Sequence, residues 1–170
     1  MPYPTLVGEP IRISARRDLC CARGRIVDDE AGTAVHAATF IRRRRIVLDA
    51  ELLSSDDELR RILIHELFHF VWARLANPVR RSWERLLAGQ RTVPGELGWS
   101  AEYRKCNLSP SDVRQRSRKW REYCCEAFCD TAAYLYARSR RHGEFTLPGS
   151  ERKRRITWFG KYLGEGNIRM

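Results

Sequence analysis

The stretch RRILIHELFHFVWARL, residues 60–75, carries two histidines four positions apart within a largely apolar run. In an α-helix, positions i and i+4 lie one turn apart on the same face. His65 and His69 would therefore lie side by side, with Glu66 next to them. These three polar side chains are the candidate functional groups of the helix, and its apolar residues are the surface on which the rest of the chain packs.

Apolar side chains recur at helical spacing from residue 59 to residue 72, which predicts a buried helix over about residues 56–75. Ser55 and Glu58 stand at capping-box spacing at its start. Its end is predicted before the Asn77-Pro78 pair, because a proline disfavours helical backbone in the residue before it.

The segment before this helix has the pattern of strands. Residues 5–53 are rich in β-branched side chains and short alternations, broken by Gly24 and the turn DDEAGT. We expect about three antiparallel strands here, the last ending near Asp49.

The segment after it is mostly helical. VRRSWERLLAG, residues 79–89, is amphipathic, whereas residues 90–112 have the Gly, Pro and Ser content of a long loop. A further helical segment is expected from Ser109 to about His142, and ITWFGKYLG predicts a short C-terminal helix.

Strands followed by helices predict an α+β fold. We expect one domain, residues 1–170, with a small, mainly antiparallel sheet packed against the helix of residues 56–75 and against a second helix downstream.

The chain is basic, with 32 Lys and Arg against 21 Asp and Glu, a net charge of +11. Such a charge attracts nucleic acids and other polyanions. Only two dense clusters stand out, Arg42–Arg45 and Arg152–Arg155, and both are also typical of solvated loops. A nucleic-acid partner is therefore weakly supported.

Nothing in the sequence indicates a membrane or secretion. No apolar run approaches the ~20 residues of a membrane span, and MPYPTLVGEPIRISARR lacks the features of a signal peptide. The expected location is the cytoplasm. The six cysteines lack the spacing of a disulfide framework or of a zinc finger, so we expect reduced thiols, packed in the core.

Two imidazoles one helical turn apart can bind a tetrahedral Zn²⁺ and leave positions for a third ligand and a water. Glu66 would then serve as the general base for that water. The alternative is structural, with two core histidines bonded to backbone or carboxylate partners.

HELFH resembles the H-E-x-x-H active-site helix of zincin metallopeptidases. The metzincin branch continues with a glycine and a third histidine, where this chain has Trp72 and Leu75. The gluzincin branch takes its third ligand from a glutamate on a later helix. YCCEAFCDTAAYLYA supplies Glu126, with Asp130 four residues further on.

The resemblance to gluzincins implies a role for each of these residues. His65, His69 and Glu126 would bind Zn²⁺, Glu66 would be the catalytic base, and Asp130 would support His65. Glu122, one turn before Glu126, is the substitute ligand. Glu126 and Asp130 could instead form a solvent-facing stripe paired with arginines.

The gluzincin resemblance also implies a group that stabilises the transition state, for which Tyr123 is the first candidate and Tyr103 and His142 are others. Larger gluzincins take this group from a further domain, and this chain is too short to contain one.

Three functions follow. The first is a zinc metallopeptidase that hydrolyses peptide or protein substrates. The second is a regulatory zincin that acts on a transcriptional partner, as in the ImmA/IrrE-like proteins that the arrangement also resembles. The third is a non-catalytic, zinc-stabilised module that binds nucleic acid. Neither the substrate nor the oligomeric state follows from the sequence.

Overall fold

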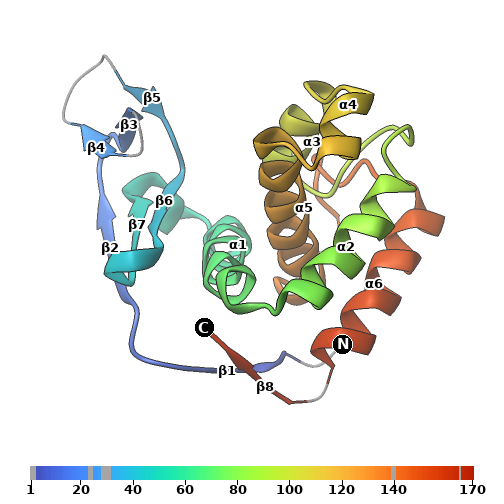
Figure 1. The fold of residues 1–170 in the computed structure, drawn as a ribbon. Coiled ribbons are helices and arrows are strands. Elements are labelled where there is room, and N and C mark those ends of the chain that lie inside the picture. Colours follow the sequence, from blue (N-terminus) through green and yellow to red (C-terminus); the bar gives the residue numbers. More distant parts are fainter. Residues whose placement is uncertain (1–2, 23–24, 28–31, 139–140, 165) are drawn as a thin grey trace.

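The computed structural model describes residues 3–22, 25–27, 32–138, 141–164 and 166–170. Helix α1 (Asp56–Arg74) lies at its centre, with two small sheets on one side, the remaining helices on the other and a two-stranded pair beneath it (Figure 1). Helix α5 (Arg118–Tyr136) packs against α1 in the opposite direction, since His65 contacts Asp130 and His69 contacts Cys125. The helix predicted around the two histidines is confirmed.

The strand side consists of two three-stranded sheets. The first has the order β2 (Arg12–Arg16), β7 (Arg45–Asp49), β6 (Ala37–Phe40), and the second has the order β4 (Arg25–Val27), β3 (Cys20–Ala22), β5 (Thr33–Ala34). Two 3-10 helices, η1 (Ile41–Arg43) and η2 (Ala50–Ser54), flank β7.

The α+β class is confirmed, but the predicted antiparallel pairing holds only in part. The β4-β3-β5 sheet and the β6–β7 pair are antiparallel, whereas β2 runs parallel to β7, with Ile13 opposite Ile46. A further parallel pair joins β1 (Thr5–Val7) to β8 (Asn167–Arg169). Strands β3, β4 and β5 lie between β2 and β6 in the sequence and form a sheet of their own. Strand β2 is therefore paired with a strand that is not its neighbour in sequence.

The helices after α1 depart from the prediction in two places. Helix α2 (Asn77–Ala88) is as expected, but α3 (Trp99–Cys106) occupies part of the predicted loop. The single helix expected from residue 109 is two helices, α4 (Pro110–Gln115) and α5. Arg116 adopts left-handed backbone with φ 48°, which ends α4, and the Ser117 hydroxyl accepts the Trp120 N–H to begin α5.

The C-terminal helix, α6 (Gly149–Leu163), begins earlier than predicted. The prediction of a capping box at the start of α1 is wrong. Ser55 makes no side-chain capping bond, and Glu58 pairs instead with Arg61 and His142, both at 2.8 Å.

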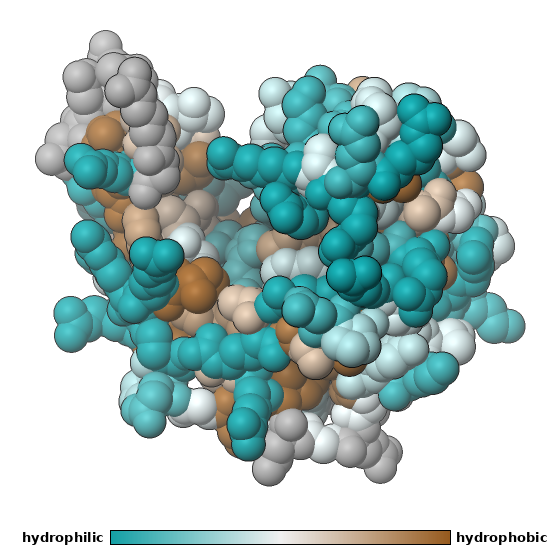
Figure 2. Space-filling view, in the orientation of Figure 1, coloured by the Kyte–Doolittle hydropathy of each residue, from teal (hydrophilic) through white to brown (hydrophobic). Residues whose placement is uncertain are grey.

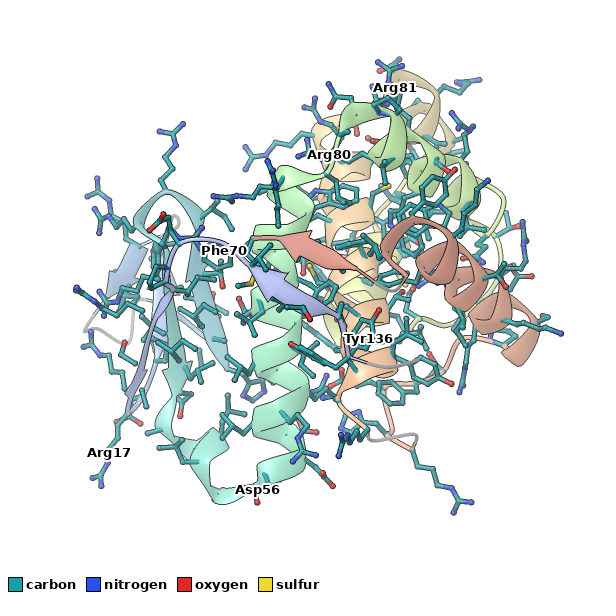
Figure 3. All side chains as sticks on the ribbon, turned by 90° about the horizontal axis from the view of Figure 1, so that it is seen from below. Arg17, Asp56, Phe70, Arg80, Arg81 and Tyr136 are labelled. Atoms are coloured by element: carbon teal, nitrogen blue, oxygen red, sulfur yellow. The ribbon has the colours of Figure 1, made fainter. Side chains whose placement is uncertain are left out.

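The main core is an aromatic cluster between α1, α2, α5 and α6. Phe128 lies 5.9 Å from Phe68 and 5.0 Å from Phe159 between ring centroids, and Trp83 lies 4.8 Å from Trp158. A second cluster joins α1 to the strands through Ile46, Leu48, Leu52 and Phe70. Phe70 is labelled on the strand side of α1 in Figure 3. Together the two clusters fix α1 from both sides.

Between α3, α5 and α6 lies a buried polar cluster, which we call the Glu96 network. The Glu96 carboxylate pairs with Arg155 at 2.7 Å and Lys105 at 3.0 Å, and it accepts the Tyr123 hydroxyl at 2.6 Å. Glu96 and Arg155 are fully buried. The network ties the loop before α3 to α3, α5 and α6.

In the described part of the chain, no helix combines the length and the apolar character needed to cross a bilayer.

Candidate metal centre

Helices α1 and α5 bring three predicted metal ligands together. The Glu126 Oε2 atom lies 3.3 Å from His65 Nε2 and 3.9 Å from His69 Nε2. The two imidazole rings are 4.9 Å apart between centroids. The solvent-facing alternative for Glu126 does not fit, because only 14% of its side chain is exposed.

Each imidazole is oriented through its other nitrogen. His65 Nδ1 lies 2.7 Å from Asp130 Oδ1, and His69 Nδ1 lies 3.4 Å from Cys125 Sγ. These contacts leave both Nε2 atoms on the Glu126 side. An outer carboxylate that fixes a ligating imidazole is a common feature of metal sites.

Asp130 is itself held by the start of α3. Its Oδ2 atom accepts the Ala101 N–H at 3.2 Å. Gly98 packs directly on the carboxylate, so that a Cβ atom at this position would lie 2.3 Å from Asp130 Cγ. The close approach of backbone and carboxylate therefore requires glycine here.

Glu66 is 8% exposed and lies on α1 between the two histidines in sequence. It is near β3, where burial, Cys20 and then Glu66 raise the pKa of the Cys21 thiol. On the other side of the centre, Arg104 of α3 approaches Glu126. The centre thus lies between β3 and α3, where Figure 2 shows the surface hollowed between the strand side and the upper helices.

Arg104 is a site residue that the sequence analysis missed. One guanidinium nitrogen lies 3.5 Å from Glu126 Oε1 and another lies 3.3 Å from Glu122 Oε2, while the buried Nε has no partner among the described residues. Arg104 thereby approaches the carboxylate oxygen that does not face the histidines. It was missed because residues 90–112 were predicted to form a loop, where no helical spacing places a side chain near the site.

The structure also offers a different third ligand. His65, His69 and Cys129 each place a donor atom within 4.8 Å of the others' donor atoms. Cys129 is fully buried, one turn after Glu126 on α5. The cysteines of this helix were expected only to pack in the core. Cys129 is therefore the second site residue, after Arg104, that the sequence analysis missed. All six cysteines are free.

The centre is a dense charge cluster. Burial opposes the charged form of Glu126, but the hydrogen bond from His65, with His69 and Arg104 nearby, lowers its pKa to about 2. Burial likewise opposes protonation of His69, yet Cys125 and Glu126 raise its pKa to about 9. Asp130 and Glu126 hold the pKa of His65 well above its usual value, against the effect of burial.

Cys125 belongs to the same cluster. A hydrogen bond from Cys129 lowers the pKa of the Cys125 thiol to about 6, with burial acting in the opposite direction and His69 supporting the thiolate. Cys125 thus borders His69 at Nδ1, whereas Nε2 of the same ring faces Glu126.

Tyr123, the expected transition-state group, is fully buried and donates its hydroxyl to Glu96. Its hydroxyl is thus committed to the Glu96 network. His142 pairs with Glu58, and Tyr103 is 59% exposed on α3. Glu122, the substitute ligand, pairs with Arg118 at 2.7 Å and with Arg104.

The residues present fit a zinc ion. Two imidazole nitrogens and one carboxylate oxygen face a common point, which is a donor set that Zn²⁺ prefers, and both imidazoles carry the outer contacts that orient a ligand. Exchanging the carboxylate for the Cys129 thiol gives a second donor set of the kind that zinc accepts. Comparison of the chain with protein families, curated proteins and solved structures gave no match.

Proposed function

We propose that this protein is a zinc-dependent metallopeptidase with a gluzincin-like site. The observation that carries the proposal is the approach of His65 Nε2 and His69 Nε2, at 3.3 and 3.9 Å, to a single oxygen of Glu126. No hydrophobic packing requirement brings these three polar groups together in a largely buried position.

His65, His69 and Glu126 would hold the zinc ion. When bound, zinc supplies a Lewis acid that polarises a substrate carbonyl and makes water nucleophilic at neutral pH. Asp130 holds the His65 ring through Nδ1, and Arg104 holds Glu126 through Oε1.

Glu66 would be the general base. Its carboxylate would accept a proton from the attacking water and later deliver it to the amine that leaves the peptide. Glu66 is a ligand in neither donor set. A substitution of Glu66 should therefore remove proton transfer without removing the metal.

The test is Glu66→Gln, with Glu51→Gln, at an exposed position of η2, as a matched control. The wild-type protein and both variants are loaded with zinc, assayed for metal by elemental analysis, and incubated with a proteome-derived peptide library read by mass spectrometry. We expect about one zinc per chain in all three, and cleavage reduced by about 100- to 10,000-fold in Glu66→Gln alone.

Cleavage by Glu66→Gln at the wild-type rate would exclude Glu66 as the base. Zinc binding without any cleavage by the wild-type protein would instead support the second candidate function, a structural zinc site. Failure of the wild-type protein to bind zinc would overturn both.

The structural candidate is favoured by Cys129, because a ligand that is fully buried is typical of a closed site without room for substrate. Cobalt substitution separates the two donor sets. A thiolate-to-cobalt charge-transfer band that is lost in Cys129→Ser but kept in Glu126→Gln would indicate the closed site. The peptidase proposal predicts no such band and weaker metal binding in Glu126→Gln.

A further inference from the structure

A second site lies away from the metal centre, in a pocket between α1 and the C-terminal end of α5. Its volume is about 510 Å³, within the range of cavities that hold small ligands. We call it the α1–α5 pocket. Its apolar wall includes Leu63 and Leu67 of α1 and Leu135 of α5, and none of the metal-centre residues lines it.

Two cations stand at this pocket without a counterion among the described residues. Arg60 of α1 and Arg138, just after α5, both line it and are both exposed. Neither makes an ion pair with a described residue, and the described lining contains no acidic side chain. Arg61, the next residue of α1, and Arg104 of α3 have carboxylate partners by contrast. The pocket therefore has a positive rim over an apolar wall.

The pocket also contains a hydrogen-bonding group that no described residue satisfies. Tyr136 lines it and is 5% exposed, and its hydroxyl oxygen is buried with no partner among the described residues. The ring is held in place by stacking on Phe68 at 5.5 Å and by an edge contact with Tyr3 at 5.5 Å. Figure 3 labels Tyr136 on α5 beside α1.

Buried hydroxyls without a partner are rare because their desolvation is uncompensated. Burial, with a smaller effect from Tyr3, raises the pKa of Tyr136 to about 12, so the hydroxyl remains a donor at neutral pH. A donor of this kind is satisfied by an acceptor oxygen on a ligand.

We propose that the α1–α5 pocket binds a small monocarboxylate with an apolar body. The leucines would cover the apolar body, while Arg60, Arg138 and the Tyr136 hydroxyl would bind the carboxylate. This inference does not depend on the metal centre or on peptidase activity.

The probe is octanoate, compared with the uncharged 1-octanol, titrated into the full-length protein by calorimetry. We expect octanoate to bind at least about tenfold more tightly than 1-octanol. Arg60→Gln with Arg138→Gln should reduce octanoate binding to the level of 1-octanol and leave 1-octanol binding unchanged. Arg114→Gln, which removes an exposed arginine on α4 outside the pocket, is the control for loss of surface charge and should change neither.

Tyr136→Phe tests the hydroxyl without changing the ring. It should weaken octanoate binding several-fold while the ligand-free protein unfolds at the same or a higher temperature, because an unpaired buried hydroxyl has been removed. A purely structural role for Tyr136 predicts lower stability and unchanged binding.

Three results would overturn the proposal. They are the absence of octanoate binding, equal affinities for octanoate and 1-octanol, and equal losses in Arg114→Gln and in the Arg60 and Arg138 double variant. Zinc content, measured on the same samples, should be unchanged in every variant.

Discussion

At the scale of single residues, Asp130 connects three parts of the candidate metal centre. One carboxylate oxygen contacts His65 Nδ1, the other accepts the Ala101 N–H, and Gly98 covers the carboxylate. The orientation of a histidine on α1 is thus set by a residue of α5 and by backbone at the start of α3.

Asp130→Asn keeps the size of the side chain and an acceptor for Ala101 but removes the negative charge beside His65. We expect zinc affinity to fall by about 10- to 100-fold, the usual effect of losing an outer carboxylate. Competition with a chelator measures the change. Asp57→Asn, in the exposed first turn of α1, is the control. Equal affinities in the two variants would show that Asp130 does not support the metal ligand.

Gly98→Ala would place a methyl group 2.3 Å from Asp130 Cγ, so the carboxylate or the backbone must move. We expect a loss of about 1–3 kcal/mol in the free energy of unfolding, together with weaker zinc binding. Gly160→Ala is the matched control. A Cβ atom there meets nothing within 4 Å, and alanine in a helix interior should stabilise α6 by up to about 1 kcal/mol. Denaturant unfolding of both variants tests the difference in sign.

At the scale of secondary-structure elements, the long periodic helices were predictable and the short elements were not. Helix α1 carries apolar residues over five turns, so its position follows from the sequence. Helix α3 has eight residues, of which only Ala101 and Lys105 are buried, and lies in a stretch rich in Gly and Pro. Its pattern is too short to identify, so Arg104 was missed with it.

The candidate site shows the same division. His65, Glu66 and His69 lie within one helix, so their spacing was enough to make them candidates. Glu126 and Asp130 required a resemblance to known peptidases, because no local pattern states which later helix packs against α1. Cys129 is indistinguishable from core packing in the sequence, since its relation to the histidines arises only from the antiparallel contact of α1 with α5.

The Glu96 network joins α3, α5 and α6, and it makes their packing sensitive to acid. Burial opposes ionisation of Glu96, but Arg155 and Lys105 together lower its pKa below the usual value. A carboxyl group with a lowered pKa in the folded state contributes stability above its unfolded pKa. That contribution is lost as the pH falls through the folded value, so the loss is expected below about pH 4.5.

Glu96→Gln leaves Arg155 and Lys105 without their anionic partner. We expect it to destabilise the protein by about 3–5 kcal/mol at neutral pH, because Arg155 is fully buried. The difference from the wild type should shrink as the pH is lowered through the acid range. Urea unfolding at several pH values measures both effects. A difference that is constant with pH would show that the Glu96 charge is not what stabilises the network.

At the scale of the whole molecule, segments from opposite ends of the sequence meet beneath α1 (Figure 1). Strand β1 pairs with β8, and Ile168 of β8 is 8% exposed and belongs to the main core. The Arg44 guanidinium donates to the Met170 and Pro10 carbonyl oxygens, both at 3.2 Å, and so ties this pair to the sheet. A sequence shows which residues alternate in a strand but not which distant strand pairs with it.

Ile168→Ala should therefore affect both ends of the chain. We expect a loss of about 2 kcal/mol, near the lower limit for a buried isoleucine because the strand is short. Hydrogen exchange should speed up in Thr5–Val7 as well as in β8, while α1 and α5 stay protected. Ile13→Ala, at a site 46% exposed, is the control and should have little effect. Unchanged exchange in β1 would mean that the two strands open independently.

The exposed edge of α3 has a practical consequence for following events at the metal centre. Of the five tryptophans, Trp99 is the most exposed at 66%, whereas Trp83, Trp120 and Trp158 are at most 7% exposed. The Trp99 ring stacks on Tyr103 at 5.4 Å between ring centroids. Tyr103 directly precedes Arg104, which approaches Glu126. A neutral quencher in solution, such as acrylamide, will therefore extinguish the fluorescence of Trp99 before that of the buried indoles. A peptide substrate bound at the proposed site beside α3 would shield Trp99, so the native chain would report its arrival without an attached dye.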